Sequence, residues 1–284
     1  MTVDVLVATY NSAHYIEEQL QSLPKQGVNL IVRDDASQDD TVERIQKYTQ
    51  PFIAEKNGGV LNNFSTLLEI SKAPYSCLSD GDDVWLPDKL SLSLAKMKEF
   101  ESADIPVLIH TDLIVVDEQL QTLSPSYWHY SSINPQYNTL NRLLAQNVVT
   151  GCTVMINKSL RDLALPIPPN CVMHDWWLAL VASAFGKIAY IDRPTVLYRQ
   201  HRNNVIGAKR SLWNKNRRTI LTKMHAQTVH FLQRYQGKLT SDQITLLENF
   251  LLFLESSPLR RYQLLKKYAF YKQGFLRNCL WLFI

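Results

Sequence analysis

Val3-Asp-Val-Leu-Val-Ala-Thr9 is the stretch that decides the fold, because a short run rich in Val and nearly free of polar side chains predicts a strand buried on both faces. Asn11 or Ser12 follows and is a good N-cap for a helix whose apolar positions continue to Leu23. A second apolar strand is predicted at 28–33, with another helix after it. This order of strand, helix, strand and helix predicts a parallel sheet with right-handed crossovers.

The alternation of strands and helices continues outward from this start to about residue 205. Further strands are predicted near 52 and at 75–78, 107–111, 148–156, 188–191 and 195–198, and further helices at 61–70, at 88–100 and after residue 175. A segment at 121–141, rich in Ser, Tyr, Asn and Pro, predicts a loop-rich insertion. Beyond residue 210 the apolar spacing is helical throughout. We therefore predict an α/β domain at 1–205 and a helical extension at 206–284.

The composition excludes several classes of protein. Of the 284 residues, 46% are hydrophobic and 20% are charged, which provides for a large buried core and excludes a disordered or fibrous chain. The four cysteines lie far apart and form no C-x-x-C pair, which disfavours a disulfide framework and a thiolate zinc site. The first residues lack the features of a secretory signal, and no apolar run is long enough to span a bilayer. We therefore expect a cytoplasmic protein.

Charge is distributed unevenly along the chain. Residues 1–198 carry 14 Lys and Arg against 23 Asp and Glu, whereas residues 199–284 carry 16 against 3. A basic, aromatic tail on an acidic body indicates an anionic partner. The acid-free stretch 260–284 is typical of a helix in the interface of an anionic membrane, which would place the protein on the inner face of the cell membrane. Packing on the domain and a dimer contact are the alternatives, and nucleic acid is disfavoured because no recognition motif is present.

Polar clusters follow three of the predicted strands, at the positions where ligands bind in an open α/β sheet. They are Thr9-Tyr-Asn11, Asp34-Asp35 and Ser79-Asp-Gly-Asp-Asp83. Carboxylates spaced Asp-x-Asp-Asp around a Gly suit a hard divalent cation, although a turn of this kind also caps helices. The sequence contains no Gly-rich phosphate loop, so we expect a metal ion to hold any phosphates.

These clusters resemble the successive nucleotide-sugar motifs of family 2 glycosyltransferases with the GT-A fold. The resemblance covers roughly residues 1–205 and is carried by Val5-Leu-Val-Ala-Thr-Tyr-Asn11, Arg33-Asp-Asp-Ala-Ser-Gln-Asp-Asp-Thr41 and Leu78-Ser-Asp-Gly-Asp-Asp-Val-Trp85. Other segments resemble, more narrowly, bacterial rhamnosyltransferases that build rhamnose-containing cell-wall polysaccharides: Leu86-Pro-Asp-Lys-Leu90, Thr150-Gly151, Met173-His-Asp-Trp-Trp177 and the segment 197–207. The resemblance implies a Rossmann-like, mostly parallel sheet flanked by helices.

The resemblance also assigns roles in binding the nucleotide. It implies that Thr9, Asn11 and Asp35 contact the base and the ribose, and that Asp34 supports them. Each of these residues lies at the end of one of the first two predicted strands or just after it.

A metal site is implied at Asp80-x-Asp82, which matches the D-x-D motif of the family. We expect Asp82 to bind Mg²⁺ or Mn²⁺ and Asp80 to contact the ribose or a metal-bound water. His201 follows the last predicted strand, where it fits a further metal ligand or a diphosphate donor, although a lone His is usually structural. Arg199 and Arg202 are placed to neutralise the leaving diphosphate, with a solvated basic loop as the alternative.

Asp175 precedes a strong helix pattern and has two interpretations. It is a good N-cap, and it is also placed as the general base that accepts the proton of the acceptor hydroxyl, which is the interpretation we predict. Trp176 and Trp177 are predicted to stack on the acceptor sugar, although core packing explains at least one of them. Many members of the family have Glu-Asp where this chain has His174-Asp175, which leaves the role of His174 open.

These inferences predict an inverting, metal-dependent transfer of L-rhamnose from dTDP-L-rhamnose to a growing, lipid-linked cell-wall or capsular glycan. The identity of the sugar rests on the resemblance alone. A UDP-hexose donor on the same fold is the first alternative. A non-catalytic glycan-binding or scaffold protein is the second, and the complete acidic cluster together with Asp175 disfavours it.

Overall fold

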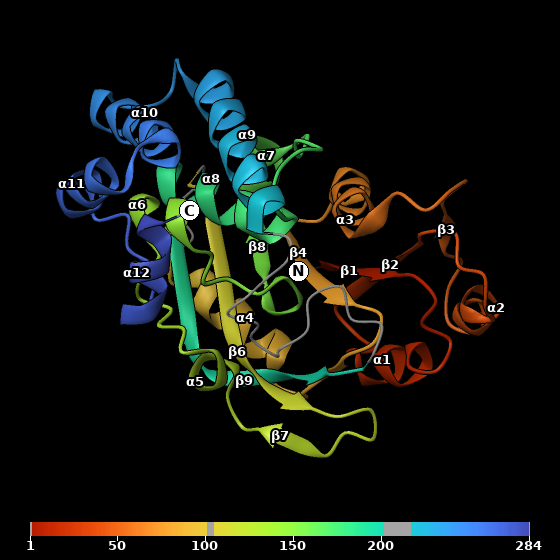
Figure 1. Cartoon of the computed structure of the whole chain (residues 1–284). Helices are drawn as coiled ribbons and strands as arrows, with labels where there is room; N and C mark the ends of the chain where they lie inside the picture. The colour runs from red at the N-terminus through yellow and green to blue at the C-terminus, as the bar shows by residue number, and fades with distance from the viewer. Residues whose placement is uncertain (1, 101–104, 202–216, 284) are drawn as a thin grey trace.

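A sheet of nine strands forms the centre of the structure, a computed structural model that describes residues 2–100, 105–201 and 217–283 (Figure 1). The strands are β1 (Val3–Thr9), β2 (Val28–Asp34), β3 (Phe52–Ile53), β4 (Tyr75–Asp80), β5 (Val84–Trp85), β6 (Val107–Val116), β7 (Thr122–Ser124), β8 (Met155–Asn157) and β9 (Lys187–Arg199). They lie in the order β3-β2-β1-β4-β8-β6-β9-β5, and β7 pairs with β6. This architecture confirms the predicted α/β class.

The parallel part of the sheet aligns the strands that carry the polar clusters. β1 pairs in parallel with β2 on one side and with β4 on the other. In this register Thr9 lies opposite Asp34, and Ala8 lies opposite Asp80. The carboxyl ends of the three strands therefore meet at one edge of the sheet, as the sequence predicts. β6 and β9 are also parallel, whereas β8 is antiparallel to both of its neighbours.

Two parts of the sheet differ from the prediction. Residues 187–199 form one long strand, β9, where two strands are predicted, because β6 pairs with β9 along its length through two register shifts. Of the strand predicted at 148–156, only the end forms a strand. Gly151–Thr153 is a single 3-10 turn, and β8 begins at Met155.

Helices cover both faces of the sheet (Figure 1). They are α1 (Ile16–Ser22), α2 (Thr41–Gln46), α3 (Gly59–Ile70), α4 (Lys89–Lys98), α5 (Tyr127–Ser131), α6 (Leu140–Ala145), α7 (Lys158–Ala164), α8 (His174–Phe185), α9 (Arg217–Tyr235), α10 (Ser241–Glu255), α11 (Pro258–Tyr268) and α12 (Phe275–Leu282). The insertion predicted as loop-rich at 121–141 contains β7, α5 and the start of α6. Among the described residues, none of the helices combines the length and the apolar character that crossing a bilayer requires.

Apolar side chains of β1 enter two separate cores. Val5 and Val7 belong to one cluster of buried residues and Leu6 belongs to the other. Because successive side chains of a strand point to opposite faces of the sheet, the two cores lie on its two sides. The predicted burial of this strand on both faces is therefore correct.

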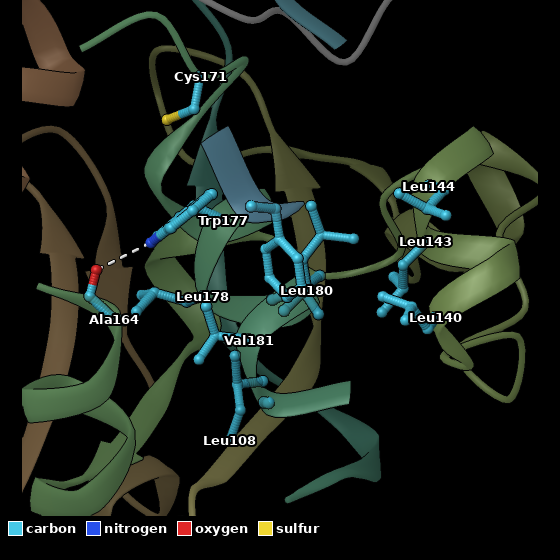
Figure 2. Close-up of a cluster of buried hydrophobic side chains, with 14 of the residues drawn as sticks. Leu108, Leu140, Leu143, Leu144, Ala164, Cys171, Trp177, Leu178, Leu180 and Val181 are labelled. Carbon is cyan, nitrogen blue, oxygen red and sulfur yellow. Dashed lines mark hydrogen bonds between the residues drawn. The ribbon is translucent and has the colours of Figure 1, made fainter. Parts of the chain in front are cut away.

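The larger core joins the α/β body to the C-terminal helices. Trp177 of α8 is fully buried and donates its indole N–H to the carbonyl of Ala164 at 2.9 Å (Figure 2). Its ring packs edge-on against Phe231 of α9. Phe250 of α10 and Trp281 of α12 are buried in the same cluster. The helical extension thus packs on the body, and the predicted boundary near residue 205 lies outside the described residues.

Candidate active site

An acidic turn joins β4 to β5 at the edge of the sheet where β1 and β2 also end. Asp80 is the last residue of β4, and Gly81, Asp82 and Asp83 follow it. The turn packs tightly on the end of β1, because a Cβ added to Gly81 would lie 2.9 Å from Thr9 Oγ1. A residue without a side chain is therefore needed at Gly81 for the acidic turn to take this place.

The carboxylates of the acidic turn repel one another. Burial, together with the charges of Asp82 and Asp175, raises the pKa of Asp80 to about 8. Asp83 is fully buried and accepts a hydrogen bond from the backbone N–H of Arg199 at 3.1 Å. Burial and the charges of its two neighbours raise the pKa of Asp83 well above its usual value. A cation bound beside these groups would relieve the repulsion.

Asp82 and His201 come together, as the sequence predicts. His201 Nε2 lies 2.8 Å from Asp82 Oδ2. The imidazole also stacks on Tyr15, just before α1, with ring centroids 4.8 Å apart. Two neighbouring ligands of an octahedral ion, each at about 2.1 Å from it, are about 3 Å apart. The contact is within hydrogen-bond distance, and the binding of a divalent cation by these two side chains stays a prediction.

Asp175 lies in the first turn of α8, close enough to Asp80 for its charge to raise the pKa of that residue. The backbone N–H of Trp176 donates to Asp175 Oδ1 at 2.6 Å, and the backbone of Gly151 also hydrogen-bonds the carboxylate. Burial outweighs these bonds and raises the pKa of Asp175 to about 7. The alternative role as N-cap is wrong, because Met173 holds that position.

His174 places a buried, neutral imidazole beside Asp175. Its ring stacks on Phe64 with centroids 4.0 Å apart, and both ring nitrogens are buried with no hydrogen-bond partner among the described residues. Burial lowers the pKa of His174 to about 3. A Cβ added to Gly151 would lie 2.8 Å from His174 Nε2, so this glycine lets the turn at 151–153 approach α8.

The residues predicted to contact the nucleotide lie together at the ends of β1 and β2. The backbone N–H of Asp35 donates to the carbonyl of Thr9 at 2.9 Å. Asn11 has a positive φ of 49° and donates its backbone N–H to Ser37 Oγ at 2.8 Å. The carboxylate of Asp34 accepts hydrogen bonds from the backbone N–H and the hydroxyl of the same serine. Asp34 therefore supports the loop, in line with its predicted role.

Thr9 and Asp35 differ in what they offer to a ligand. Thr9 Oγ1 is buried without a hydrogen-bond partner within the described ranges, so its hydroxyl is available for a new bond. The carboxylate of Asp35 is 2% exposed and accepts the backbone N–H groups of Gly58 and Gly59, the latter at 2.7 Å. In this structure Asp35 holds the start of α3, and its contact with a nucleotide stays a prediction.

Comparison with known proteins identifies the family to which this arrangement belongs. Residues 4–163, which include β2, β4, the acidic turn and all of β1 except Val3, match the family described as Glycosyl transferase family 2. This chain belongs to that family. The glycosyltransferase is 30% identical over 239 residues to the dTDP-rhamnosyl transferase RfbG of Shigella flexneri, an alignment that covers 76% of this chain and 79% of that relative.

Solved structures share the fold of this glycosyltransferase. S. aureus TarS in complex with UDP-GlcNAc matches with a TM-score of 0.63 and 18% identity, over 88% of this chain and 70% of TarS. The mannosyltransferase PcManGT from Pyrobaculum calidifontis, in complex with GDP-Man and Mn²⁺, matches with a TM-score of 0.56 and 15% identity, over 98% of this chain and 77% of PcManGT. These likenesses confirm the predicted GT-A fold.

Arg199 has a different role in this glycosyltransferase from the predicted one. Its guanidinium is 2% exposed, and its Nε donates to the carbonyl of Asp82 at 2.9 Å. The two terminal nitrogens donate to the carbonyl of Glu118 and to the carboxylate of Glu18, each at 2.5 Å. The predicted contact with a leaving diphosphate is therefore wrong, because protein oxygens already bind the guanidinium. Arg199 holds the acidic turn against β9 and α1.

The predicted acceptor contact is also wrong for Trp177, because its ring is fully buried among core side chains. Trp176 is half-buried and donates its indole N–H to the carbonyl of Leu143 at 2.6 Å, and its contact with an acceptor stays a prediction. Arg202 lies outside the described residues.

Sequence analysis missed Lys89. This lysine is 1% exposed, donates to the carbonyl of Cys152 at 2.8 Å, and lies 4.4 Å from the centroid of the Trp85 ring. It joins α4 to the turn at 151–153, and its positive charge lowers the pKa of Asp80 against the larger effect of burial. The spacing of Lys89 from Ser93 and Met97, the other buried residues of α4, is the signal in the sequence that could have found it.

Proposed function

We propose that this glycosyltransferase transfers L-rhamnose from dTDP-L-rhamnose to a growing, lipid-linked glycan, with inversion at the anomeric carbon. Membership of family 2 supports transfer from a nucleotide sugar. The 30% identity to a dTDP-rhamnosyl transferase, over most of both chains, supports the rhamnose donor. The observation that carries the reaction is a buried carboxyl group, Asp175, beside the acidic turn formed by residues 80–83.

The side chains at the acidic turn fit Mg²⁺ or Mn²⁺. Asp82 and His201 offer an oxygen and an imidazole nitrogen 2.8 Å apart, and Asp80 lies beside them. Cys152 lies within 4.8 Å of Asp80 and Asp83, and burial raises the pKa of its thiol well above the ordinary value. The oxygen-rich set therefore favours a hard cation. The chemistry that such an ion supplies is neutralisation of the charge that develops on the leaving diphosphate.

Asp175 accepts the proton in the proposed reaction. The acceptor hydroxyl oxygen bonds to the anomeric carbon while the bond from that carbon to the diphosphate oxygen breaks. The electron pair of the broken bond leaves with dTDP, and the hydroxyl proton passes to the carboxylate of Asp175. A carboxyl group whose pKa is about 7 is suited to this transfer at neutral pH. One displacement, assisted by one base, inverts the configuration.

We also propose that the C-terminal helices attach the protein to an anionic membrane surface on the cytoplasmic side. Phe275 at the start of α12 is 81% exposed and Phe283 just after it is 73% exposed. Leu259 and Tyr262 of α11 are also exposed, and Lys266 and Lys267 lie on the same helix. Bulky apolar groups next to cations suit the interface of an anionic bilayer.

A panel of nucleotide sugars tests the proposed donor. The full chain is incubated with dTDP-rhamnose, UDP-glucose, UDP-GlcNAc or GDP-mannose, each with Mn²⁺, with Mg²⁺ or with EDTA, and release of the nucleotide is measured. We expect turnover of dTDP-rhamnose to exceed that of the other sugars and to stop in EDTA. Preferred turnover of a UDP-hexose would replace the proposed donor. The absence of turnover with every sugar and metal would favour the non-catalytic alternative.

A further inference from the structure

A cavity of about 840 Å³, largely open to solvent, lies between the insertion and the C-terminal helices. Its walls come from α5 and the loop after it, from α6, from β9 and from the segment between α11 and α12, which Figure 1 shows around the long strand β9. Tyr190 and Asp192 of β9 line this cavity, whereas Arg199 at the end of the same strand holds the acidic turn. At about 3.3 Å per residue, the stretch of β9 from Tyr190 to Arg199 is up to about 30 Å long. The cavity therefore lies at the other end of β9 from the acidic turn, and Leu143, next to Arg142, accepts a hydrogen bond from Trp176, the residue after Asp175.

Arg142 of α6 lines this cavity and is held there by two aromatic rings. Its guanidinium carbon lies 4.8 Å from the ring centroid of Tyr137 and 4.9 Å from that of Tyr271. Within the part of the chain that the structure describes, its guanidinium has neither a hydrogen-bond acceptor nor an ion-pair partner. Arg161 and Arg261, by contrast, donate to protein oxygens. The guanidinium of Arg142 therefore has its hydrogen-bonding capacity available to a ligand.

The surroundings of Arg142 favour an anion. A planar guanidinium held between rings is preorganised to bind the oxygens of a phosphate in a two-pronged way. Lys272 lines the same cavity, and Gly274 at its rim is the N-cap of α12, a helix start that no side chain caps. Asp192 provides the one carboxylate among the lining residues that the structure describes. Cations thus outnumber acids in the cavity.

The remaining lining side chains suit a sugar attached to that anion. Trp128, Tyr137 and Tyr190 contribute aromatic rings, and Asn134 and Gln136 contribute amides. The C–H faces of a pyranose pack on aromatic rings, and its hydroxyl groups exchange hydrogen bonds with amides.

We propose that this cavity binds the phosphate of a phosphate-linked saccharide, with Arg142 as the residue that binds the anion. Two sources share this chemistry, a glycan linked to a lipid diphosphate and a soluble sugar phosphate. Assignment of the saccharide as the glycosyl acceptor rests on the proposed function, whereas binding of the phosphate does not depend on it. The exposed side chains of Phe275 and Leu276 follow Gly274 directly, next to where a lipid would leave the cavity.

Calorimetric titration of the full chain tests the site with N-acetylglucosamine 1-phosphate and with N-acetylglucosamine as probes. We expect the phosphate to tighten binding to the wild type by about tenfold or more, and Arg142→Ala to remove this gain. Arg260→Ala, which changes an exposed arginine of α11, should retain it. Equal affinities of the wild type and Arg142→Ala for the phosphate probe would overturn the proposal, as would no binding of that probe to the wild type.

Asp192→Asn provides a second test that does not remove a packed side chain. Removing this exposed carboxylate should tighten binding of N-acetylglucosamine 1-phosphate several-fold, because it withdraws a like charge from the cavity. Unchanged or weaker binding by this variant would contradict the site.

A third probe, N-acetylglucosamine linked to farnesyl diphosphate, distinguishes the two sources. Tighter binding of this probe than of the sugar phosphate supports the lipid-linked source, and equal binding supports the soluble one. Turnover of dTDP-rhamnose by the wild type is measured in parallel. If the wild type binds the phosphate probe but does not turn over dTDP-rhamnose, the proposed function is wrong and the phosphate site stands.

Discussion

The guanidinium of Arg199 donates from Nε to the backbone carbonyl of Asp82 at 2.9 Å, whereas the carboxylate of Asp82 contacts His201. The end of β9 thus supplies the residue that holds the acidic turn, and His201, two residues after that strand, contacts the carboxylate of Asp82. Because Arg199 also binds Glu18 just after the start of α1, three segments of the chain are fixed around Asp82.

Arg199→Ala tests this anchor. The substitution leaves the carbonyls of Asp82 and Glu118 without their buried donor, so we expect the free energy of unfolding to fall by roughly 2–4 kcal/mol. Denaturant unfolding measures the loss. Arg193→Ala, on the same strand, changes an arginine that is 60% exposed and should cost less than about 1 kcal/mol. Similar losses in the two variants would show that Arg199 does not anchor the turn.

Asp82→Asn tests the metal site. The substitution removes an anionic oxygen from the pair with His201, so donor turnover should fall about a hundredfold or more and should need a higher Mn²⁺ concentration. A titration of activity with Mn²⁺ measures both effects, and circular dichroism checks the fold. Asp162→Asn, at a side chain that is 50% exposed, serves as the control. Full activity of the wild type in EDTA would refute the metal requirement.

Asp175→Asn separates proton transfer from donor binding. Asn can still accept the backbone N–H of Trp176 but cannot take a proton from the acceptor, so kcat should fall by about 10² to 10⁴ while donor affinity changes little. Steady-state kinetics and donor titration measure the two quantities, and NMR of the wild-type product should show inverted configuration. Retained configuration, or a kcat within a few-fold of the wild type, would exclude Asp175 as the base.

The pH dependence of the reaction follows from the raised pKa of Asp175. Since the base must be ionised, kcat should fall about tenfold per unit below pH of about 7 and level off above it. The same shift means that the folded protein binds this proton more tightly than the unfolded chain. The contribution of Asp175 to stability is therefore present near pH 3.8 and is lost as the pH rises to about 7. The range from pH 5 to 8 includes the pKa of about 7, so a kcat that stays constant over this range would argue against Asp175 as the base.

Phe275→Ser combined with Leu276→Ser tests attachment to membranes without removing α12. A truncation would be ambiguous, because Trp281 of the same helix is buried in the larger core. Loss of two exposed apolar side chains, each contributing about 2 kcal/mol when inserted, should reduce sedimentation with phosphatidylglycerol vesicles more than tenfold and leave donor turnover unchanged. Leu123→Ser, at an exposed residue of β7, is the control. Unchanged sedimentation of the double variant would exclude this face.

Local patterns in the sequence predicted the features that depend on neighbouring residues. The apolar run at 3–9 specified a strand buried on both sides, and the polar residues after it specified the edge of the sheet at which ligands bind. The Asp-x-Asp motif around Gly81 specified the acidic turn, because the spacing of its carboxylates and its tight backbone are both local properties.

Only the tertiary structure decided which of the predicted polar and aromatic groups can reach a ligand. Trp176 and Trp177 are adjacent in the sequence, yet only Trp177 is fully buried, because α7 and α9 pack on its side of α8. Arg199 binds Glu18, which is 181 residues away, and a partner so distant leaves no local pattern. Burial and hydrogen bonding depend on segments that meet only when the chain folds, so sequence reasoning placed Arg199 and Trp177 at the site but assigned them the wrong roles.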